Sequence, residues 1–552
     1  MPVINFGYSD LCGLIGKKIP KDVLIDRIPM IGADMHDTDS DNADDMSVEF
    51  FPDRPDLYSA EGLARALRAF LDIRPGMMTY HVNRTDIVMN TEKSVKDVRP
   101  YVLCAAVLDI HITDDILRSL MEMQEKLHLT IGRKRSKIAI GVHDLDNVKR
   151  PFTYKAVSPK EISFVPLAKT ERWDLDEILR KHEKGVDYAH LLEGKKKYPI
   201  ITDSNGDVLS FPPIINGVLT TVTTKTKNLF IDVTGTDMKA VKGALDIMVT
   251  ALAERGGKIG AVRMTGAIEC DSPDLSAKEW KIDVKECERF IGVAIGADGI
   301  IRALRKMGLD AEKDNGHITV SVPPFRMDIM HPVDIYEDVA TGHGFENFGS
   351  EHSLIQTTGR KSDMTMVSDR LRDVMIGLGY TEVTTLTLSS EEDEFLRSGL
   401  PEKKTVKVLN PITEDHTCLR SSLLPSVMRI IRKNKHRDLP QKIFEIGDVI
   451  EDMKKQRRLC AVATHSRTSF TEIKSIAESV LREMRQTFVL RPCSYPTFIE
   501  GRGAEIVVNG KAEGFFGEMS PSVIMNYEID RPVILFEMNV SDIAKDLSVG
   551  LF

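Results

Sequence analysis

Residues 326–342 read Arg326-Met-Asp-Ile-Met-His-Pro-Val-Asp-Ile-Tyr-Glu-Asp-Val-Ala-Thr-Gly342, which is the most specific local pattern in the chain. Pro332 suits the first position of a helix, where the missing N–H costs no intrahelical hydrogen bond. A helix that begins there turns three carboxylates to one face at i, i+3 and i+4, and a fourth enters from the preceding segment. The four carboxylates belong to Asp328, Asp334, Glu337 and Asp338.

Carboxylate oxygens are the ligands that Mg²⁺ and Ca²⁺ prefer, and no imidazole–thiolate set suggests zinc. Two explanations without a metal stay open. Acidic residues in the first turn of a helix are stabilised by its dipole by about 0.3–1 kcal/mol each. Like charges at i and i+4 repel each other, so a counter-charge is expected, and Arg326 can supply it in place of a metal ion.

A second candidate site lies in the stretch Asn228-Leu-Phe-Ile-Asp-Val-Thr-Gly-Thr-Asp237. A buried strand with this ending presents the Asp232 carboxylate and the Thr234 hydroxyl at one edge, where a polar substrate group can bind. The alternative is an Asx or Ser/Thr turn that caps a helix starting near Met238. His143 is equally ambiguous, since an isolated histidine is more often structural than catalytic.

Helical and strand patterns are mixed along the rest of the chain, so we expect a multidomain α+β fold. The expected helices include residues 114–127, 298–307, 369–377, 423–433 and 472–488. The expected strands include residues 101–108, 137–142, 318–322, 383–388, 504–508 and 533–538. Four units are expected, at residues 1–97, 98–257, 274–350 and 351–552.

The composition of the chain excludes several classes of protein. Its 552 residues carry 74 Lys+Arg against 83 Asp+Glu, a net charge of -9, which argues against a nonspecific coat for nucleic acid. Any RNA would bind local basic clusters, such as residues 133–135, 195–197, 429–437 and 454–458. No apolar run reaches the length of a membrane span and no export signal is seen, so we expect a cytoplasmic protein without membrane contact.

Several nucleotide and nucleophile motifs are absent from the sequence. It contains no Walker P-loop, no dinucleotide-binding glycine pattern and no nucleophile elbow. The patterns F-R-x-E and G-x-G-x-x-R, in which an arginine holds ATP in some nucleotide-binding enzymes, do not occur in residues 350–552. Seven scattered cysteines without a C-x-x-C pair make a disulfide framework or a cysteine zinc site improbable.

A series of motifs resembles the β-subunit family of phenylalanyl-tRNA synthetase in its archaeal and eukaryotic cytosolic form. Two of them are Leu419-Arg-Ser-Ser-Leu-Leu-Pro425 and Phe444-Glu-Ile-Gly-Asp448. The others, in chain order, are residues 53–67, 124–128, 132–135, 139–146, 211–217 and 328–338. The resemblance spans nearly the whole chain, with one departure at Asp53, where the family usually has Asn.

The resemblance implies the functions of the four units. An N-terminal domain would precede a B3/B4 editing domain, a small winged-helix-like B5 domain and an antiparallel-sheet module like a class II catalytic domain. It also implies a Mg²⁺ site on Asp328, Asp334, Glu337 and Asp338 that is shared with an α subunit. The α subunit would bind most of the phenylalanine and ATP, in a complex of two α and two β chains that charges tRNA(Phe).

An editing domain has a physical rationale. A phenylalanine pocket rejects tyrosine by only roughly a hundredfold, because tyrosine merely adds a hydroxyl, so a second hydrolytic site is needed. We expect Asp232 and Thr234, with Ser210 nearby, to bind the phenol hydroxyl, and residues 195–197 to contact tRNA. Hydrolysis would use a positioned water and the tRNA terminus.

Two alternative functions stay open. The chain is either a free-standing tRNA-binding editing protein without a synthetase partner, or a scaffold that only organises the α chain.

Overall fold

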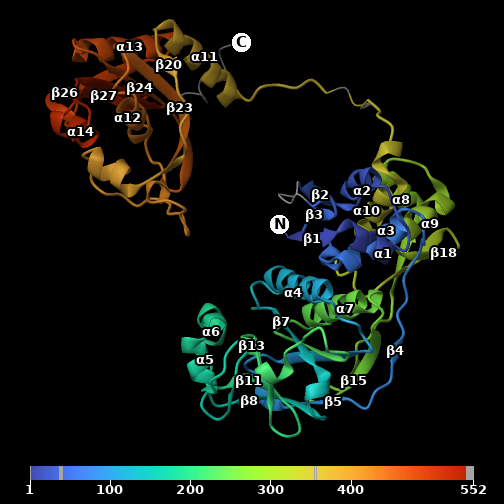
Figure 1. The fold of residues 1–552 in the computed structure, drawn as a ribbon. Coiled ribbons are helices and arrows are strands. Elements are labelled where there is room, and N and C mark those ends of the chain that lie inside the picture. Colours follow the sequence, from blue (N-terminus) through green and yellow to red (C-terminus); the bar gives the residue numbers. More distant parts are fainter. Residues whose placement is uncertain (1, 37–41, 353–354, 356, 542–552) are drawn as a thin grey trace. The chain divides into compact units, whose positions relative to one another are not determined.

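The computed structural model describes residues 2–36, 42–352, 355 and 357–541 (Figure 1). The chain forms two compact units, Met1–Glu351 and His352–Phe552. In the described part of the chain, no helix is both long and apolar enough to cross a membrane. The expected α+β multidomain class is confirmed, since both units mix helices with sheets.

The first unit begins with a three-stranded antiparallel sheet in the order β1-β3-β2. Its strands are β1 (Val3–Gly7), β2 (Ala33–His36) and β3 (Asp45–Phe50), and its helices are α1 (Tyr8–Ile15), α2 (Lys21–Arg27) and α3 (Ala60–Phe70). The Ser59 side chain caps α3 by accepting a hydrogen bond from the Gly62 N–H. Leu63 and Leu67, which follow the helical period, are fully buried in the core.

The largest sheet of the first unit has eleven strands in the order β13-β12-β11-β8-β5-β15-β6-β14-β7, with β16 and β4 also paired to β15. Its strands are β4 (Val82–Asn83), β5 (Val88–Thr91), β6 (Tyr101–Leu108), β7 (Ile138–Asp144), β8 (Phe152–Val157), β11 (Tyr198–Thr202), β12 (Val208–Phe211), β13 (Ile215–Asn216), β14 (Leu229–Gly235), β15 (Lys258–Gly266) and β16 (Cys270–Ser272). This sheet draws strands from before residue 98 and after residue 257, so it extends past both ends of the second expected unit.

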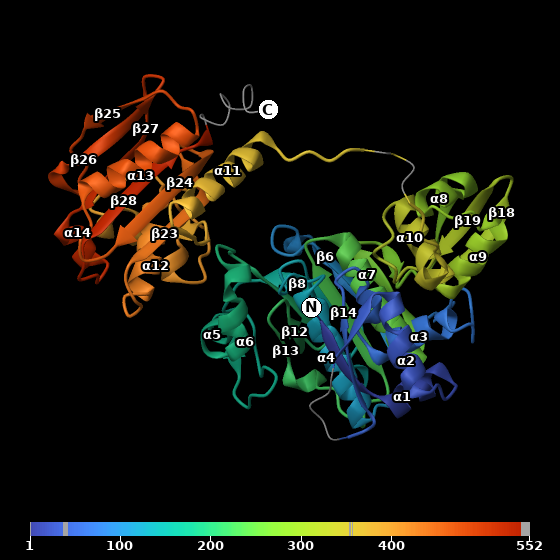
Figure 2. The same cartoon turned by 90° about the horizontal axis from the view of Figure 1, so that it is seen from above.

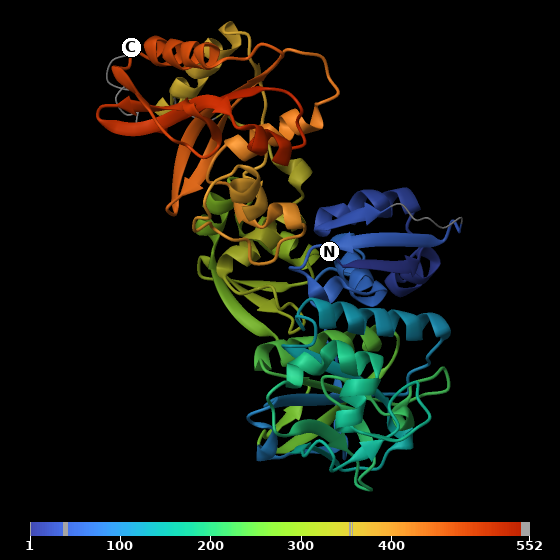
Figure 3. The same ribbon diagram turned by 90° about the vertical axis from the view of Figure 1, so that its left-hand side faces the viewer.

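Two helices cover one face of this sheet, where α4 (Asp114–Leu129) and α7 (Met238–Glu254) lie side by side (Figures 1 and 3). Strand β14 lies between β6 and β7 and runs antiparallel to both. A small helical layer packs near β11 and β12, formed by α5 (Leu175–Lys181) and α6 (Glu183–Tyr188) beside the short pair β9 (Ser163–Phe164) and β10 (Trp173–Asp174). Strand β14 is therefore buried between layers.

The first unit ends in a small three-stranded sheet, β17-β19-β18, with three helices. Its elements are β17 (Lys278–Asp283), α8 (Val284–Ile291), α9 (Gly296–Lys306), β18 (Asp310–Asp314), β19 (His317–Val322) and α10 (Pro332–His343). Pro332 stands at the first helical position as expected, and Gly308 follows α9 with a φ of +75°. Helices α9 and α10 meet at Gly342, where a Cβ would lie 2.2 Å from the Ala303 carbonyl oxygen.

The second unit is a seven-stranded sheet in the order β20-β23-β24-β28-β27-β26-β25, antiparallel except for the β20–β23 pair. Its strands are β20 (Thr381–Glu382), β23 (Gln441–Glu451), β24 (Lys454–Thr464), β25 (Phe488–Pro492), β26 (Phe498–Val508), β27 (Lys511–Met519) and β28 (Val533–Asn539). Helices α11 (Asp363–Gly377) and α13 (Phe470–Glu483) pack on one face, and α12 (Leu424–Lys433) and α14 (Pro521–Asn526) pack on the other (Figure 2).

In this unit, one expected strand and the C-terminal end of one expected helix are wrong. The segment 383–388 alternates apolar and β-branched residues, but only its last residue is in a strand, β21 (Leu388–Ser389), paired with β22 (Cys418–Leu419). The Glu445 carboxylate accepts from the Thr385 N–H, so a side chain replaces part of the ladder. The helix expected at 472–488 ends at Glu483, because Arg485 has a φ of 52° and Phe488 opens β25.

Candidate functional site

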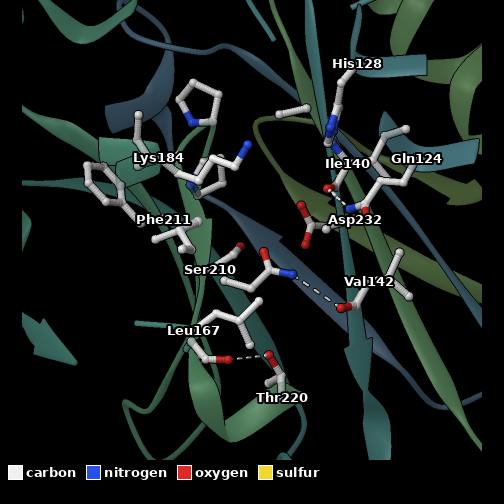
Figure 4. A pocket seen from close by; sticks show the side chains of 18 of the residues that line it. Gln124, His128, Ile140, Val142, Leu167, Lys184, Ser210, Phe211, Thr220 and Asp232 are labelled. Atoms are coloured by element: carbon white, nitrogen blue, oxygen red, sulfur yellow. Dashed lines mark hydrogen bonds between the residues drawn. The ribbon is translucent and has the colours of Figure 1, made fainter. Parts of the chain in front are cut away.

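A cavity of about 310 Å³ opens beside β14 in the first unit (Figure 4). Its walls come from α4, β7, the β12–β13 region and β14 itself, with Lys184 of α6 at one side. Asp232 and Thr234 of β14 and Ser210 of β12, which the sequence singles out, all line this cavity. Figure 4 shows Ser210 and Asp232 pointing into its middle. The fold therefore brings the three expected polar groups to one place.

Asp232 lies inside β14 and is 1% exposed. Its Oδ1 lies 2.7 Å from His143 Nε2, and His143 Nδ1 lies 2.8 Å from Thr220 Oγ1. A carboxylate oxygen accepts, so His143 donates to Asp232 through Nε2. A Cβ at Gly141 would lie 2.4 Å from Asp232 Oδ1, so only glycine fits across from it. Among the described residues, Asp232 Oδ2 has no hydrogen-bond partner.

Thr234 is oriented by Arg99, a buried residue that sequence reasoning missed. Arg99 Nε donates to Thr234 Oγ1 at 3.0 Å, and its Nη2 donates to the Thr234 carbonyl at 2.9 Å. Burial lowers the pKa of Arg99 to about 10, which leaves the guanidinium charged at neutral pH. The two residues are 135 positions apart, so no local pattern reveals the contact.

Ser210 has a free hydroxyl in the cavity wall. The residue is 2% exposed and its Oγ makes no hydrogen bond within the described structure. Leaving a buried polar group unpaired costs about 1–3 kcal/mol, so such a group is suited to a ligand that completes it. The cavity therefore offers a hydroxyl at Ser210 and a carboxylate oxygen at Asp232 to an incoming polar group.

The cavity holds no activated nucleophile among its lining residues. Ser210 Oγ has no base bonded to it, and no cysteine lines the walls. His128 Nε2 accepts from the Ile140 N–H at 2.8 Å, and burial lowers the pKa of this histidine. His128 thus orients strand β7, and the walls are equipped for polar recognition.

The four carboxylates of residues 328–338 line one pocket, and two of them, Asp328 and Asp338, contact the buried Arg326. Its Nη2 donates to Asp328 Oδ2 and Asp338 Oδ2, both at 2.7 Å, and its Nε donates to Asp328 Oδ1 at 2.9 Å. Burial by itself lowers the pKa of Arg326, but the carboxylates of Asp338 and Asp328 outweigh it and leave the pKa raised. Asp334 Oδ2 accepts from the N–H groups of Met330 and His331, which caps α10.

This arrangement does not fit a metal ion held by this chain alone. Both Asp328 oxygens and one Asp338 oxygen are occupied by Arg326. Over the described ranges, no three His, Cys, Asp or Glu side chains come together as a metal-ligand group. The counter-charge here is the arginine, which was one of the two open explanations without a metal.

In the second unit, the buried Arg420 and the half-buried Arg458 are paired with carboxylates. Arg420 Nη2 lies 2.9 Å from Glu445 Oε1, and Arg458 Nη1 donates to Glu537 Oε1 at 2.9 Å. The Glu537 carboxylate also accepts from the N–H groups of Leu423 and Leu424 at the start of α12. These guanidinium groups are engaged inside the unit, which leaves them unsuited to holding a triphosphate.

The basic clusters differ in their relation to the cavity. Lys195 Nζ donates to the Asp97 carbonyl at 2.7 Å, and residues 195–197 do not line the cavity. Arg135, the last residue of the run 133–135, does line it, and so does Lys184. The first expectation for tRNA contact, residues 195–197, thus lies outside the cavity wall.

Three family models match the chain. The phenylalanyl tRNA synthetase beta chain CLM domain matches residues 352–540, the tRNA synthetase B5 domain matches residues 280–345, and the B3/4 domain matches residues 112–251. The cavity lies mostly within the range of the third model.

Relatives with the name phenylalanine–tRNA ligase beta subunit cover almost the whole chain. The protein of Methanothrix thermoacetophila is 45% identical over 98% of this chain and 100% of its own length. That of Archaeoglobus fulgidus is 44% identical over 98% of both. A crystal structure of an N-terminal fragment of the phenylalanyl-tRNA synthetase beta subunit from Pyrococcus horikoshii covers 62% of this chain and 100% of the fragment, at 40% identity and a TM-score of 0.60.

Proposed function

The chain belongs to the family of phenylalanine–tRNA ligase β subunits, and from that premise we propose that it joins an α subunit to charge tRNA(Phe) and removes tyrosine attached in error. The observation that carries the editing part is the cavity in which Ser210, Asp232 and Thr234 meet. At about 310 Å³ it stands at the lower end of ligand pockets, which span about 300–1,000 Å³.

The adenylation step is assigned to the α subunit. The second unit matches the CLM model and lacks both arginine motifs of class II ATP sites. Its Arg420 and Arg458 form ion pairs with Glu445 and Glu537. ATP and phenylalanine would therefore bind mainly to the partner. Two α and two β chains stay the proposed stoichiometry.

The polar cavity wall supports discrimination between tyrosine and phenylalanine. A tyrosyl side chain can donate its phenol hydroxyl to Asp232 and accept from Ser210, which completes both groups. A phenylalanyl side chain leaves them unpaired, and a site built to bond a hydroxyl rejects the analogue without it by a factor of about 10⁴–10⁵. The correct product is therefore spared while the wrong one is bound.

The hydrolytic step is proposed to use a water molecule and the tRNA terminus. Ser210 has no bonded base, and His128 Nε2 is occupied by the Ile140 N–H, so neither provides a covalent route. The chain's own residues bind and orient the aminoacyl group. Arg99 and His143 hold Thr234 and Asp232 in place for that task.

Mutation of the cavity wall tests the editing proposal. In the complex with the α subunit, Asp232→Ala and Thr234→Ala should each slow the deacylation of tyrosyl-tRNA(Phe) by about 10- to 100-fold, which is the worth of a hydrogen bond to a charged group. Charging with phenylalanine should be unchanged. The matched control is Asp246→Ala, which removes a buried carboxylate of α7 that does not line the cavity. Undiminished deacylation in both cavity variants would contradict the proposal.

The same assays on the complex with the α subunit distinguish two alternative functions, a free-standing editing protein and a scaffold. A free-standing editing protein would deacylate tyrosyl-tRNA without stimulating any partner, whereas the match of the second unit to the CLM model and the full-length relatives favour a synthetase subunit. A scaffold would support charging but show no deacylation. The carboxylates of Asp328, Asp334, Glu337 and Asp338 do not fit Mg²⁺ within this chain alone. We therefore propose that any Mg²⁺ binds them only in the complex with the α subunit.

A further inference from the structure

Three consecutive basic residues beside the cavity adopt a left-handed backbone. Arg133, Lys134 and Arg135 have φ angles of 45°, 53° and 65°. Non-glycine residues visit this region as single residues, and each costs about 1–2 kcal/mol. Such strain persists only where the surroundings enforce it, and it concentrates at functional sites. The left-handed backbone of residues 133–135 therefore indicates a functional role for this turn.

The turn is held rigidly against the cavity. Its ends are closed by backbone hydrogen bonds, with the Gly132 N–H donating to Leu127 O at 2.8 Å and the Lys137 N–H donating to Gly132 O at 2.9 Å. Buried Arg99, which orients Thr234, also donates through Nη2 to the Arg135 carbonyl at 3.2 Å. The Arg99 guanidinium thus hydrogen-bonds both the turn, at Arg135, and the proposed tyrosine-binding wall, at Thr234.

Arg135 joins the turn to the opposite side of the cavity. Its Nη1 donates to the carbonyls of Pro213 and Ile214 at 3.3 and 2.9 Å, and its Cζ lies 4.5 Å from the centroid of the Tyr188 ring. Arg135 is therefore occupied by protein groups. Arg133 and Lys134, which precede it in the turn, are exposed.

The exposed cations of this region fall into two groups. Lys137 pairs with Asp237 at 2.8 Å, and Lys181 pairs with Glu177 at 2.7 Å. Arg133, Lys134 and Lys184 have no ion-pair partner in the described part of the chain. Lys184 lines the cavity. Figure 4 shows it across the cavity from His128, with its amino group directed inward. Lys184 is thus an unpaired cation in the cavity wall, and Arg133 and Lys134 are unpaired cations directly before Arg135, which lines the cavity.

We infer that Arg133, Lys134 and Lys184 form a cationic rim that binds backbone phosphates of the single-stranded acceptor end of tRNA and guides the aminoacyl group into the cavity. This inference rests on the proposed function and names the tRNA contacts of the same site. On a chain with a net charge of -9, three unpaired cations beside one cavity concentrate the attraction for phosphate at its entrance.

The test compares two variants with equal loss of charge. The rim variant is Arg133→Asn, Lys134→Asn and Lys184→Gln, in which asparagine is chosen because it tolerates a left-handed backbone. The control is Lys195→Gln, Lys196→Gln and Lys197→Gln. Each is purified with its α subunit and assayed for single-turnover deacylation of tyrosyl-tRNA(Phe) over a range of enzyme and salt concentrations.

The rim variant should raise the half-saturating enzyme concentration at least about tenfold and leave the maximal rate unchanged. Its salt dependence, as the slope of log affinity against log salt, should become shallower by about 2, because each phosphate contact on a single strand contributes about 0.7. Charging with phenylalanine should be unaffected. The charge-conserving variant Arg133→Lys, Lys134→Arg and Lys184→Arg should match the wild type, which shows that the fold tolerates changes here.

Several results would overturn the inference. Wild-type binding by the rim variant, an equal weakening in the Lys195–Lys197 control, or a lost maximal rate in the charge-conserving variant would each do so. If the wild-type complex itself fails to deacylate tyrosyl-tRNA, the proposed function fails first, and the inference falls with it. Deacylation by the wild type with an unaffected rim variant overturns the rim alone.

Discussion

Arg326 shows how one buried guanidinium bridges two carboxylates that the sequence assigns to a metal site. Its guanidinium bonds Asp328 and Asp338 at 2.7 Å each, in a buried position. Burial raises the pKa of Asp338, and the arginine opposes that shift. Removing one partner of such a group leaves a buried charge without compensation, which costs about 3–5 kcal/mol.

Arg326→Met should therefore lower the free energy of unfolding of the full chain by about 3–5 kcal/mol, measured by urea denaturation. Adding Asp338→Asn to this variant should recover part of the loss, because it removes the orphaned charge. A chelator should leave the wild-type midpoint unchanged. If the chelator instead lowers it, a metal ion and not the arginine holds these carboxylates.

The packing of α9 against α10 depends on the close contact of two elements at Gly342. A Cβ there would lie 2.2 Å from the Ala303 carbonyl oxygen, so the helices must separate to admit one. Gly13, in helix α1 of the same unit, has nothing within 4 Å of its would-be Cβ. The two glycines thus separate the effect of packing from that of helix propensity.

Gly342→Ala should destabilise the chain by about 1–3 kcal/mol through overpacking. Gly13→Ala should be neutral or stabilise it by up to about 1 kcal/mol, because alanine has the higher helix propensity. Thermal and urea unfolding of the full chain measure both. Equal effects of the two substitutions would show that α9 and α10 do not pack as closely as described.

At the scale of the whole molecule, the chemistry is divided between two compact units. The first holds the cavity with its free Ser210 hydroxyl, and the second holds arginines that are already paired with carboxylates. Arg420 and Arg458 are occupied in this way and are not free to orient a triphosphate. Under the proposed function, this chain recognises an aminoacyl group and a partner subunit activates one.

The isolated chain should give no phenylalanine-dependent exchange of pyrophosphate into ATP, and exchange should appear when the α subunit is added. Mass measurement of the mixture identifies the complex responsible. The α subunit alone serves as the control for its own contribution. Exchange by the isolated chain would contradict the division of labour argued above.

The sequence by itself determined the elements whose signals are local. Pro332 starts α10 and residues 101–108 form β6, because proline and apolar periodicity act within a few residues. It also identified Asp232 and Thr234 as polar groups on a buried strand. The segment 383–388 escaped this reasoning, since the Glu445 carboxylate that takes its backbone N–H lies 60 residues away.

Only the tertiary structure decided which of these groups act together. The pairing of His143 with Asp232 spans 89 residues and that of Arg99 with Thr234 spans 135, and both depend on the order of strands in the sheet. The unpaired state of Ser210 and the insertion of Arg326 between two carboxylates depend on packing in the same way. Hydrogen bonds form over about 3 Å in space, and separation along the chain places no bound on which residues come that close.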